Sequence, residues 1–159
     1  MIWREDRLVV NSIARALRQE GVRLVMLSRT KPPVPGQFIK CDFAHPESIP
    51  TDLPAVDFLI NNAGVFLEKP VPEISLEDWE QVFRVNVTAP FLLTRAVLPG
   101  MIRRKYGRIV NVSSVTGPMV SSRGSSAYSA AKAAMIGMSR SIAIEVAMKN
   151  ITINNVAPG

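Results

Sequence analysis

The stretch from residue 108 to residue 156 decides the fold. Residues 108–112 read RIVNV, residues 126–148 read SAYSAAKAAMIGMSRSIAIEVAM, and residues 151–156 read ITINNV. The first and the third are apolar runs of strand length, and the second is a segment of helix length between them. Such alternation is typical of a parallel α/β sheet, in which a helix crosses over between neighbouring strands.

The same alternation continues toward the N-terminus. Further strands are expected over residues 8–10, 22–28, 37–41 and 56–60. A helix is expected to begin at Asn11 or Ser12, either of which can cap it. Ser75–Arg104 is predicted to be helical but punctuated by Pro90 and Pro99. The chain has no internal repeat and no linker, so residues 1–159 are predicted to form a single, incomplete domain.

Composition excludes several classes of protein. Apolar residues make up 47% and charged residues 20% of the chain, which is typical of a globular protein. Cys41 is the single cysteine, so no internal disulfide is possible and a cytoplasmic location is expected. No apolar stretch approaches the ~20 residues that cross a bilayer, so we expect no membrane association. No metal site is expected either.

The net charge of +6 raises the question of an anionic partner. The basic residues are scattered, and Arg103-Arg104-Lys105 is the longest run. Cations suit the negative end of a helix dipole, so this run is interpreted as a solvated helix end, with an anion site as the alternative. No basic stripe with interleaved aromatic residues is visible, so nucleic acid is not an expected partner.

Tyr128 and Lys132 are the most informative pair. They lie four residues apart in the predicted helix, so they share one helix face about one turn apart. A phenol has a pKa near 10, too high for acid-base work at neutral pH, and a nearby ammonium lowers that pKa by stabilising the phenolate. The alternative is a surface tyrosine beside a solvated lysine.

Polar residues follow two of the predicted strands. Asn111-Val-Ser-Ser114 ends the strand before the long helix, and Asn61-Asn-Ala-Gly64 follows the strand over residues 56–60. Ligands of open α/β sheets bind at the carboxyl ends of strands, where a serine hydroxyl can bond a substrate carbonyl. Taken alone, each segment is better explained as an ordinary strand-to-loop turn.

Taken together and in this order, these segments resemble the classical short-chain dehydrogenase/reductase family. The resemblance runs from about Ser12 to Gly159. It rests on Asn61-Asn-Ala-Gly64, Asn86 in Arg-Val-Asn-Val, Asn111-Val-Ser-Ser114, Tyr128-Ser-Ala-Ala-Lys132 and Asn155-Val-Ala-Pro-Gly159. It implies a Rossmann-like three-layer α/β/α fold with a mostly parallel sheet, and it is strongest to 3-oxoacyl-carrier-protein reductases. The implied activity is NAD(P)-dependent hydride transfer between a ketone, including a 3-oxoacyl thioester, and a secondary alcohol.

The resemblance also implies roles for four residues. Tyr128 would exchange the proton with the carbonyl oxygen, and Lys132 would depress the tyrosine pKa and hold the nicotinamide ribose. Ser114 would orient the substrate oxygen, and Asn86 would anchor a water linking Lys132 to solvent. Ser114 is chosen over Ser113 because the second serine is the family's usual catalytic one. Its separation from Tyr128 (128 − 114 = 14) is one more than the commonest family spacing.

The cofactor expected from the resemblance is NADP, with NAD as the alternative. The family's cofactor-binding positions correspond here to Ser28, Arg29, Asp42, Asn62, Ala63, Gly64, Tyr128, Lys132, Pro158 and Gly159. Asp42 would bond the adenine amine. Ser28 is followed by Arg29 rather than by an acid, and an arginine at this place accommodates the 2′-phosphate of NADP. The alternative is that Arg29 is a solvated loop residue.

The chain departs from the family pattern at both ends. The family's glycine loop, Thr-Gly-x-x-x-Gly-x-Gly, is absent, because Leu8-Val-Val-Asn11 runs straight into Ser12-Ile-Ala. Its glycines let the backbone approach the pyrophosphate, so weakened cofactor binding is expected. The family's elements beyond Gly159 are also absent, so the sheet face that they cover should be exposed.

Two functions therefore remain open. The first is an oxidoreductase acting on a small carbonyl or alcohol substrate. The second is a catalytically inactive remnant that serves as a dimerisation or interaction module. In the family the helices corresponding to Ser75–Arg104 and Ser126–Met148 form the subunit interface, so a homo-oligomer through them is expected. Small residues in the second helix would allow close helix approach: Ala130, Ala133, Ala134 and Gly137.

Overall fold

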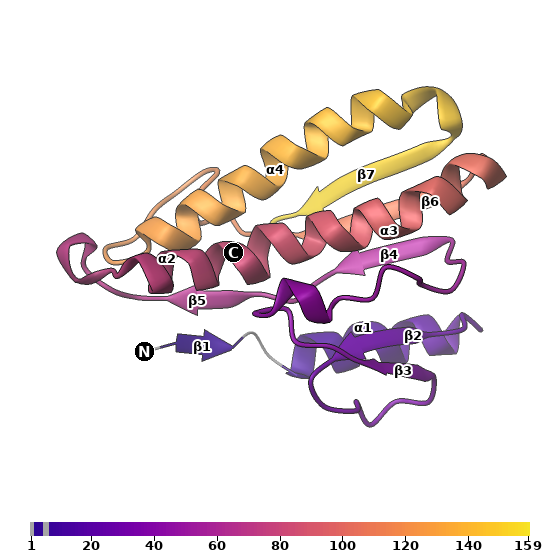
Figure 1. Ribbon diagram of the computed structural model, residues 1–159, viewed down its shortest axis with the longest axis horizontal. Helices are drawn as coiled ribbons and strands as arrows, with labels where there is room; N and C mark the ends of the chain where they lie inside the picture. The colour runs from indigo at the N-terminus through magenta and orange to yellow at the C-terminus, as the bar shows by residue number, and fades with distance from the viewer. Residues whose placement is uncertain (1, 5–6) are drawn as a thin grey trace.

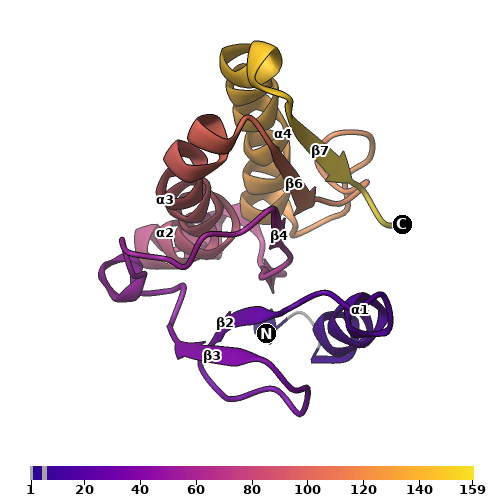
Figure 2. The same cartoon turned by 90° about the vertical axis from the view of Figure 1, so that its right-hand side faces the viewer.

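The computed structural model describes residues 2–4 and 7–159, with side chains from Val9 onward. Its largest sheet has three parallel strands in the order β4-β6-β7. These are β4 Phe58–Asn61, β6 Gly107–Val112 and β7 Ile151–Val156. A second parallel pair, β2 Val25–Ser28 and β3 Gln37–Lys40, lies beside β4 (Figure 2). The strands predicted over these five segments are confirmed, with ends shifted by up to three residues.

Helices lie on both sides of the layer of strands, as the three-layer prediction requires. Helix α1 Arg7–Gln19 places Ala14 against Met26 on one face, whereas Leu27 packs toward Leu93 on the other. That second face carries α2 Leu76–Phe83, α3 Ala89–Arg104 and α4 Ser126–Val146. Figure 2 shows α1 and the α2–α4 group on opposite sides of the strands. The predicted Rossmann-like α/β/α architecture is confirmed.

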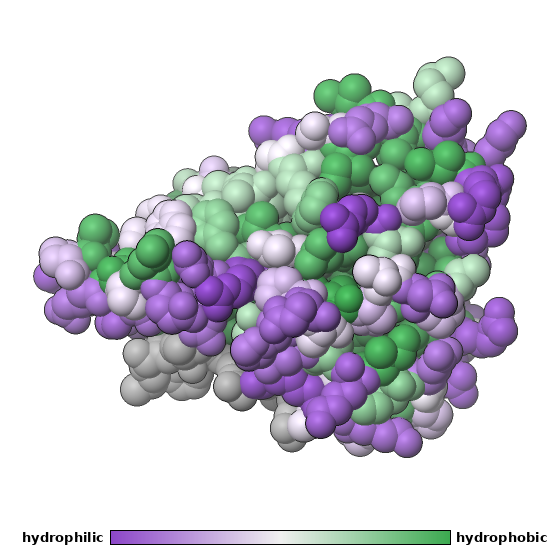
Figure 3. Space-filling model, viewed as in Figure 1, coloured by the Kyte–Doolittle hydropathy of each residue, from purple (hydrophilic) through white to green (hydrophobic). Residues whose placement is uncertain are grey.

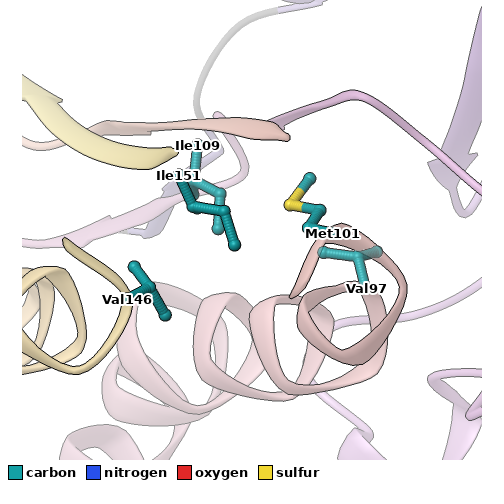
Figure 4. Packing of buried hydrophobic residues seen from close by; sticks show 5 residues of the cluster. All are labelled: Val97, Met101, Ile109, Val146 and Ile151. Carbon is teal, nitrogen blue, oxygen red and sulfur yellow. The ribbon is translucent and has the colours of Figure 1, made fainter. Parts of the chain in front are cut away.

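The main core lies between β6, β7 and the two long helices. Five buried apolar side chains meet there (Figure 4): Val97, Met101, Ile109, Val146 and Ile151. Met101 and Ile109 are fully buried. Burial of such side chains from water is the main source of stability in a sheet covered by helices. This core fixes α3 and α4 against the strands whose ends carry the candidate site.

The predicted strand over residues 8–10 is wrong, because these residues lie in the first turn of α1. The helix begins at Arg7 rather than at Asn11 or Ser12, so neither of these residues caps it. The chain has no glycine at this point that would let it turn sharply between a strand and a helix. Helix α1 ends where predicted, just before Gly21, which has a positive φ of 75°.

A second difference is the antiparallel pair of β1 Ile2–Arg4 with β5 Val65–Leu67. This pair extends beyond the carboxyl end of β4 (Figure 1). No ladder of hydrogen bonds joins β2 to β4 within residues 2–4 and 7–159, so the sheet is divided between these two strands.

The helical run over Ser75–Arg104 is continuous where two interruptions were predicted. Ser75 and Asp78 form a capping box at its start. Pro90 is the second residue of α3 and Pro99 lies inside α3, so neither proline ends the run. Between α2 and α3 the chain forms a π-helical segment over Arg84–Thr88. Short 3-10 turns elsewhere span Pro46–Ser48, Val71–Glu73 and Ala147–Lys149.

This run also corrects the expectation about apolar length. By length and composition, Leu76–Arg104 could cross a membrane. Part of it is buried, however, and α3 packs on β4 and β6 with Leu93, Val97 and Met101 inward. It is therefore a core helix of the α/β domain.

The sheet face opposite α3 and α4 is partly bare, as expected. Phe58 on β4 is 48% exposed and Val156 on β7 is 51% exposed. The two side chains alternate with inward residues such as Leu59 and Ile153, which pack on the main core.

Candidate active site

Tyr128 and Lys132 lie on the inner face of α4. Tyr128 is 5% exposed and Lys132 is fully buried. The Nζ atom of Lys132 lies 5.4 Å from the centre of the Tyr128 ring, within the range of a cation–π contact. The interpretation of this pair as a solvated surface tyrosine and lysine is therefore wrong.

Lys132 also joins α4 to the end of β6. Its Nζ donates a hydrogen bond to the carbonyl oxygen of Val112 at 2.8 Å. In return, the buried Ser113 hydroxyl donates to the carbonyl oxygen of Lys132 at 3.2 Å. These two bonds hold Lys132, and with it α4, against the end of β6, the strand that Ser114 follows.

Ser113 and Ser114 therefore have different surroundings. Ser113 is buried and bonded to the helix backbone. Ser114 is half-buried, and its hydroxyl oxygen accepts a hydrogen bond from the N–H of Thr116 at 3.1 Å. Among the hydrogen bonds of residues 9–159, none is donated by this hydroxyl, and the substrate-orienting role of Ser114 stays a prediction.

The segment after Ser114 is held close to α4 by a glycine. Gly117 has a φ of 105°, and a Cβ atom at this position would overlap the carbonyl oxygen of Ser129. An isolated bridge pairs Thr116 with Val120 and closes the turn. Gly117 was not among the predicted site residues, although a glycine three residues after a strand-end serine pair is a recognisable signal of close backbone approach.

Phe66 is the second missed residue. It comes from β5 and its ring meets Tyr128 edge to face, with 4.9 Å between the ring centres and 78° between the planes. This geometry is favourable for an aromatic pair and restricts the tilt of the phenol ring. Phe66 lies in β5, an element without a predicted counterpart, so no local pattern pointed to this residue.

Asn86 lies in the π-helical segment and is fully buried. Its amide nitrogen donates to the carbonyl oxygens of Val65 and Val82, both at 2.9 Å, and its Oδ1 accepts from the N–H of Val65 at 3.3 Å. Asn86 thus joins α2 to β5, the strand that carries Phe66. The water-anchoring role expected for Asn86 stays a prediction.

The cofactor-binding candidates fall into two groups. Those after β3 and β4 are partly enclosed: Asn62 is buried, Asp42 is half-buried, and Asp42 accepts from the N–H of Ala44 at 3.1 Å. Arg29 after β2 is exposed, and the preceding Ser28 hydroxyl donates to the carbonyl oxygen of Thr30 at 2.6 Å.

The remaining candidates lie at the same edge of the sheet. Ala63 and Gly64 are half-buried between β4 and β5, whereas Pro158 and Gly159 are exposed after β7. The carbonyl oxygen of Pro158 accepts from the N–H of Val115, so the segment after β7 lies beside the one after Ser114. Of the residues predicted for catalysis, Lys132 is bonded to the last residue of β6 and Ser114 follows that strand by two residues. Asn86 is bonded to β5 instead.

An open groove of about 340 Å³ lies near the start of α4, lined by Val71, Ile74, Ser75, Leu76, Trp79 and Ser126. Neither Tyr128 nor Ser114 lines it. It is therefore separate from the candidate active site.

The model of the short chain dehydrogenase family matches residues 10–159. The chain belongs to the short-chain dehydrogenase family. The prediction made from the five ordered motifs is thereby confirmed, and the chain is an oxidoreductase-family protein with an NAD(P)-binding type of fold.

Two curated relatives are similar over much of the chain. Nodulation protein G of Rhizobium meliloti is 49% identical over 108 residues, which cover 68% of this chain and 44% of that protein. The 3-oxoacyl-[acyl-carrier-protein] reductase of Vibrio cholerae is 40% identical over 131 residues, which cover 78% of this chain and 53% of that enzyme. The chain spans about half the length of these relatives.

Solved structures show the same similarity in three dimensions. A metagenomic short-chain oxidoreductase in complex with NADP is 29% identical, with a TM-score of 0.84 over 94% of this chain and 76% of that one. A 4-hydroxyisoleucine dehydrogenase complexed with NADH is also 29% identical, with a TM-score of 0.83 over 93% of this chain and 69% of that one.

Proposed function

We propose that the chain is the cofactor-binding and catalytic module of an NADP-preferring reductase that interconverts a ketone and a secondary alcohol. The observation that carries this proposal is the position of Lys132, which touches the ring of the buried Tyr128 and is bonded to the end of β6. A phenol held beside a buried ammonium has the arrangement needed for proton transfer at neutral pH. The similarity to 3-oxoacyl-[acyl-carrier-protein] reductases supports a 3-oxoacyl thioester as the substrate class.

In the direction of reduction, the Tyr128 hydroxyl donates its proton to the carbonyl oxygen of the substrate. The ammonium of Lys132 stabilises the phenolate that remains. The Ser114 hydroxyl donates a hydrogen bond to the same oxygen and holds it toward Tyr128. A bound nicotinamide would supply the hydride that reaches the carbonyl carbon.

The residues at the nicotinamide side fit such a cofactor. Lys132 is bonded to the last residue of β6, at the carboxyl end of that strand, where ligands of open α/β sheets bind. The pyrophosphate side fits less well, because α1 begins at Arg7 without a glycine that would admit a phosphate close to the backbone. We therefore expect weaker cofactor binding than in a chain that has the glycine loop.

The preference for NADP rests on Arg29. Its exposed side chain after β2 is available to pair with a 2′-phosphate, and no acid stands beside it to bond a 2′-hydroxyl. Arg29→Asp should therefore lower affinity for NADPH much more than affinity for NADH.

The proposed partner for assembly is a second copy of the chain, through α3 and α4. Large apolar side chains on these helices are exposed, among them Phe91, Ile102 and Ile144. Ala133 and Gly137 of α4 are exposed as well, so this helix offers small residues to a neighbour. In Figure 3 hydrophobic side chains gather over the part of the molecule where Figure 1 places α3 and α4.

The test uses the two tyrosines of the chain as a matched pair. The purified chain is titrated with NADPH and NADH through Trp79 fluorescence and assayed with a 3-oxoacyl thioester. Tyr128→Phe should lower turnover by about 10²- to 10⁴-fold while NADPH still binds. Tyr106→Phe, a change at a 36% exposed ring far along the sheet, should leave turnover intact.

Absence of turnover in a folded sample that binds NADPH would overturn the catalytic proposal. A folded dimer that binds neither cofactor nor substrate would instead favour the inactive interaction module. Sedimentation measures the mass in both cases.

A further inference from the structure

Phe66 and Tyr128 meet across two elements that are far apart in the sequence. Phe66 is the middle residue of β5, and Tyr128 is the third residue of α4. Their rings pair edge to face, with 4.9 Å between the ring centres and 78° between the planes. Aromatic pairs in this arrangement are more favourable than the burial of their area alone, so the contact favours one tilt of the Tyr128 ring.

Lys132 contacts the same ring from within α4. Its Nζ lies 5.4 Å from the centre of the Tyr128 ring and is held in place by its bond to the carbonyl oxygen of Val112 at 2.8 Å. The last torsion of a tyrosine side chain has a broad energy minimum, so neighbouring groups rather than rotamer preference set the tilt of the ring. Of these two ring contacts, only the one with Phe66 is made by a residue outside α4.

The backbone on both sides of Phe66 is held against the helices. Asn86 Nδ2 donates to the carbonyl oxygen of Val65 at 2.9 Å, and Asn86 Oδ1 accepts from the N–H of Val65 at 3.3 Å. On the other side, Leu67 is 4% exposed and packs in one apolar cluster with Ala127 of α4. These contacts fix the distance between β5 and the start of α4, so the Phe66 ring stays within reach of Tyr128.

The surroundings of Phe66 differ from those of its two neighbours in the chain. Val65 and Leu67 belong to the apolar cluster under α4. Successive side chains of a strand point to opposite faces, so Phe66 points away from that cluster. Its side chain is half-buried, and its ring pairs with Tyr128. The aromatic ring at this position is therefore explained by contact with Tyr128 rather than by packing of the core.

We propose that Phe66 is a positioning residue for Tyr128, which it holds at the ring tilt that also contacts the Lys132 ammonium. The proposal rests on the proposed function, in which Tyr128 exchanges a proton with the substrate oxygen. That transfer needs the phenol oxygen within about 2.6–3.2 Å of the substrate oxygen, and a displacement of about 1 Å can lower the rate about 10²-fold. Phe66 thus acts on the proton-transfer step through Tyr128 and not on cofactor binding.

The kinetic test replaces the ring of Phe66 by a side chain without one. Phe66→Leu should lower kcat at least about tenfold, because the phenol is no longer held at one tilt, while KM and affinity for NADPH change by less than about twofold. Phe58→Leu is the matched control. Phe58 also pairs edge to face with a tyrosine, Tyr106, at 6.4 Å and 88°, but it is 48% exposed on the sheet face opposite α3. Phe58→Leu should leave kcat unchanged.

Two further readouts separate positioning from partial unfolding. Unfolded protein lowers kcat without changing the solvent isotope effect, whereas slower proton transfer makes that step more limiting. The ratio of kcat in H2O to kcat in D2O should therefore be larger in Phe66→Leu than in wild type. Phe66→Tyr keeps the ring and should retain kcat within about threefold of the wild-type value. Equal kcat in Phe66→Leu and Phe58→Leu would overturn the proposal, and so would a fall in kcat with an unchanged solvent isotope effect or without recovery in Phe66→Tyr.

Nitration tests the ring contact without turnover. The chain has two tyrosines, so in a Tyr106→Phe background Tyr128 is the one that tetranitromethane can modify. Tyr128 is 5% exposed. Its nitration, followed by intact mass, should be several-fold faster in Phe66→Leu than in Phe58→Leu, because loss of the Phe66 ring uncovers it.

The nitration rates keep this proposal separate from the reductase proposal. If the wild-type chain folds and binds NADPH but shows no turnover, the reductase proposal fails on its own. Faster nitration in Phe66→Leu would then still support the role of Phe66 in holding the Tyr128 ring, and equal rates in Phe66→Leu and Phe58→Leu would overturn it.

Discussion

Lys132 of α4 donates from its buried Nζ to the carbonyl oxygen of Val112, the last residue of β6, at 2.8 Å. This bond ties the helix that carries Tyr128 to the strand that leads to Ser114. The proposed acid-base pair and the hydroxyl proposed to orient the substrate are thus connected through two residues of backbone.

Removal of the hydroxyl should lower stability at Ser113 and kcat at Ser114. Ser113→Ala loses a buried bond to the Lys132 carbonyl, so it should lower the free energy of unfolding by about 1 kcal/mol with little effect on kcat. Ser114→Ala should leave stability nearly unchanged and lower kcat at least about tenfold. Urea denaturation and steady-state kinetics measure both; a large loss of kcat in Ser113→Ala alone would reverse the assignment.

Asn111 of β6 lies between its register partners Asn61 of β4 and Asn155 of β7, and we expect it to contribute to stability. Asn111→Ala leaves Asn61 Nδ2 and the Ser139 hydroxyl without their buried partner, so the free energy of unfolding should fall by about 3 kcal/mol. Asn154→Ala, at an exposed position of β7, is the matched control and should change it by less than about 0.5 kcal/mol. Thermal or urea unfolding measures the difference. A similar fall in the free energy of unfolding in the two variants would contradict this role of Asn111.

Gly117 should tolerate no side chain. Gly117→Ala needs a left-handed backbone and places a Cβ on the Ser129 carbonyl oxygen, so it should displace the segment after Ser114. We expect the free energy of unfolding to fall by about 2 kcal/mol, and we expect turnover to fall as well. Gly137→Ala is the control, because open space surrounds that helical position. Alanine there should raise the free energy of unfolding by at most about 1 kcal/mol. Equal stability of both variants would refute the close approach.

Asp78 should contribute a pH-dependent part of the stability. The bond from Lys69 at 2.6 Å, together with the Ser75 capping bonds, lowers the pKa of Asp78 to about 2. An unfolded aspartate has a pKa near 3.9, so the contribution is present above about pH 4 and is lost as the pH falls through about 2. Thermal melts should show Asp78→Asn less stable than wild type at pH 6 and equal to it near pH 2. A difference that does not vary with pH would contradict this mechanism; Glu145→Gln is the exposed control.

Much of the sheet was predictable because its strands are short apolar runs that end in polar residues. Residues 108–112 and 151–156 show this pattern, and the long helix between them has the length of a crossover. Residues 8–10 have the same apolar pattern but form a helical turn, because without a glycine the chain does not reverse between a strand and α1. Local pattern therefore identifies strand-forming segments, and turn chemistry decides whether they reach the sheet.

The site was predictable in part for a related reason. Tyr128 and Lys132 are linked by helical spacing, a local property that a sequence displays. Phe66 reaches Tyr128 from β5, and Asn86 reaches that same strand from a π-helical segment, so both depend on contacts between distant parts of the chain. The family resemblance identified Asn86 but not Phe66, since only Asn86 belongs to one of the ordered motifs.

The rate at which the buried cysteine reacts would report how often the domain opens locally. Cys41 is the one thiol of the chain and is 2% exposed, and burial raises the pKa of this thiol. An alkylating reagent can therefore react with the Cys41 thiol only when the region around β3 separates from α3. The labelling rate in native buffer, followed by mass spectrometry, would report the free energy of that opening without any introduced probe.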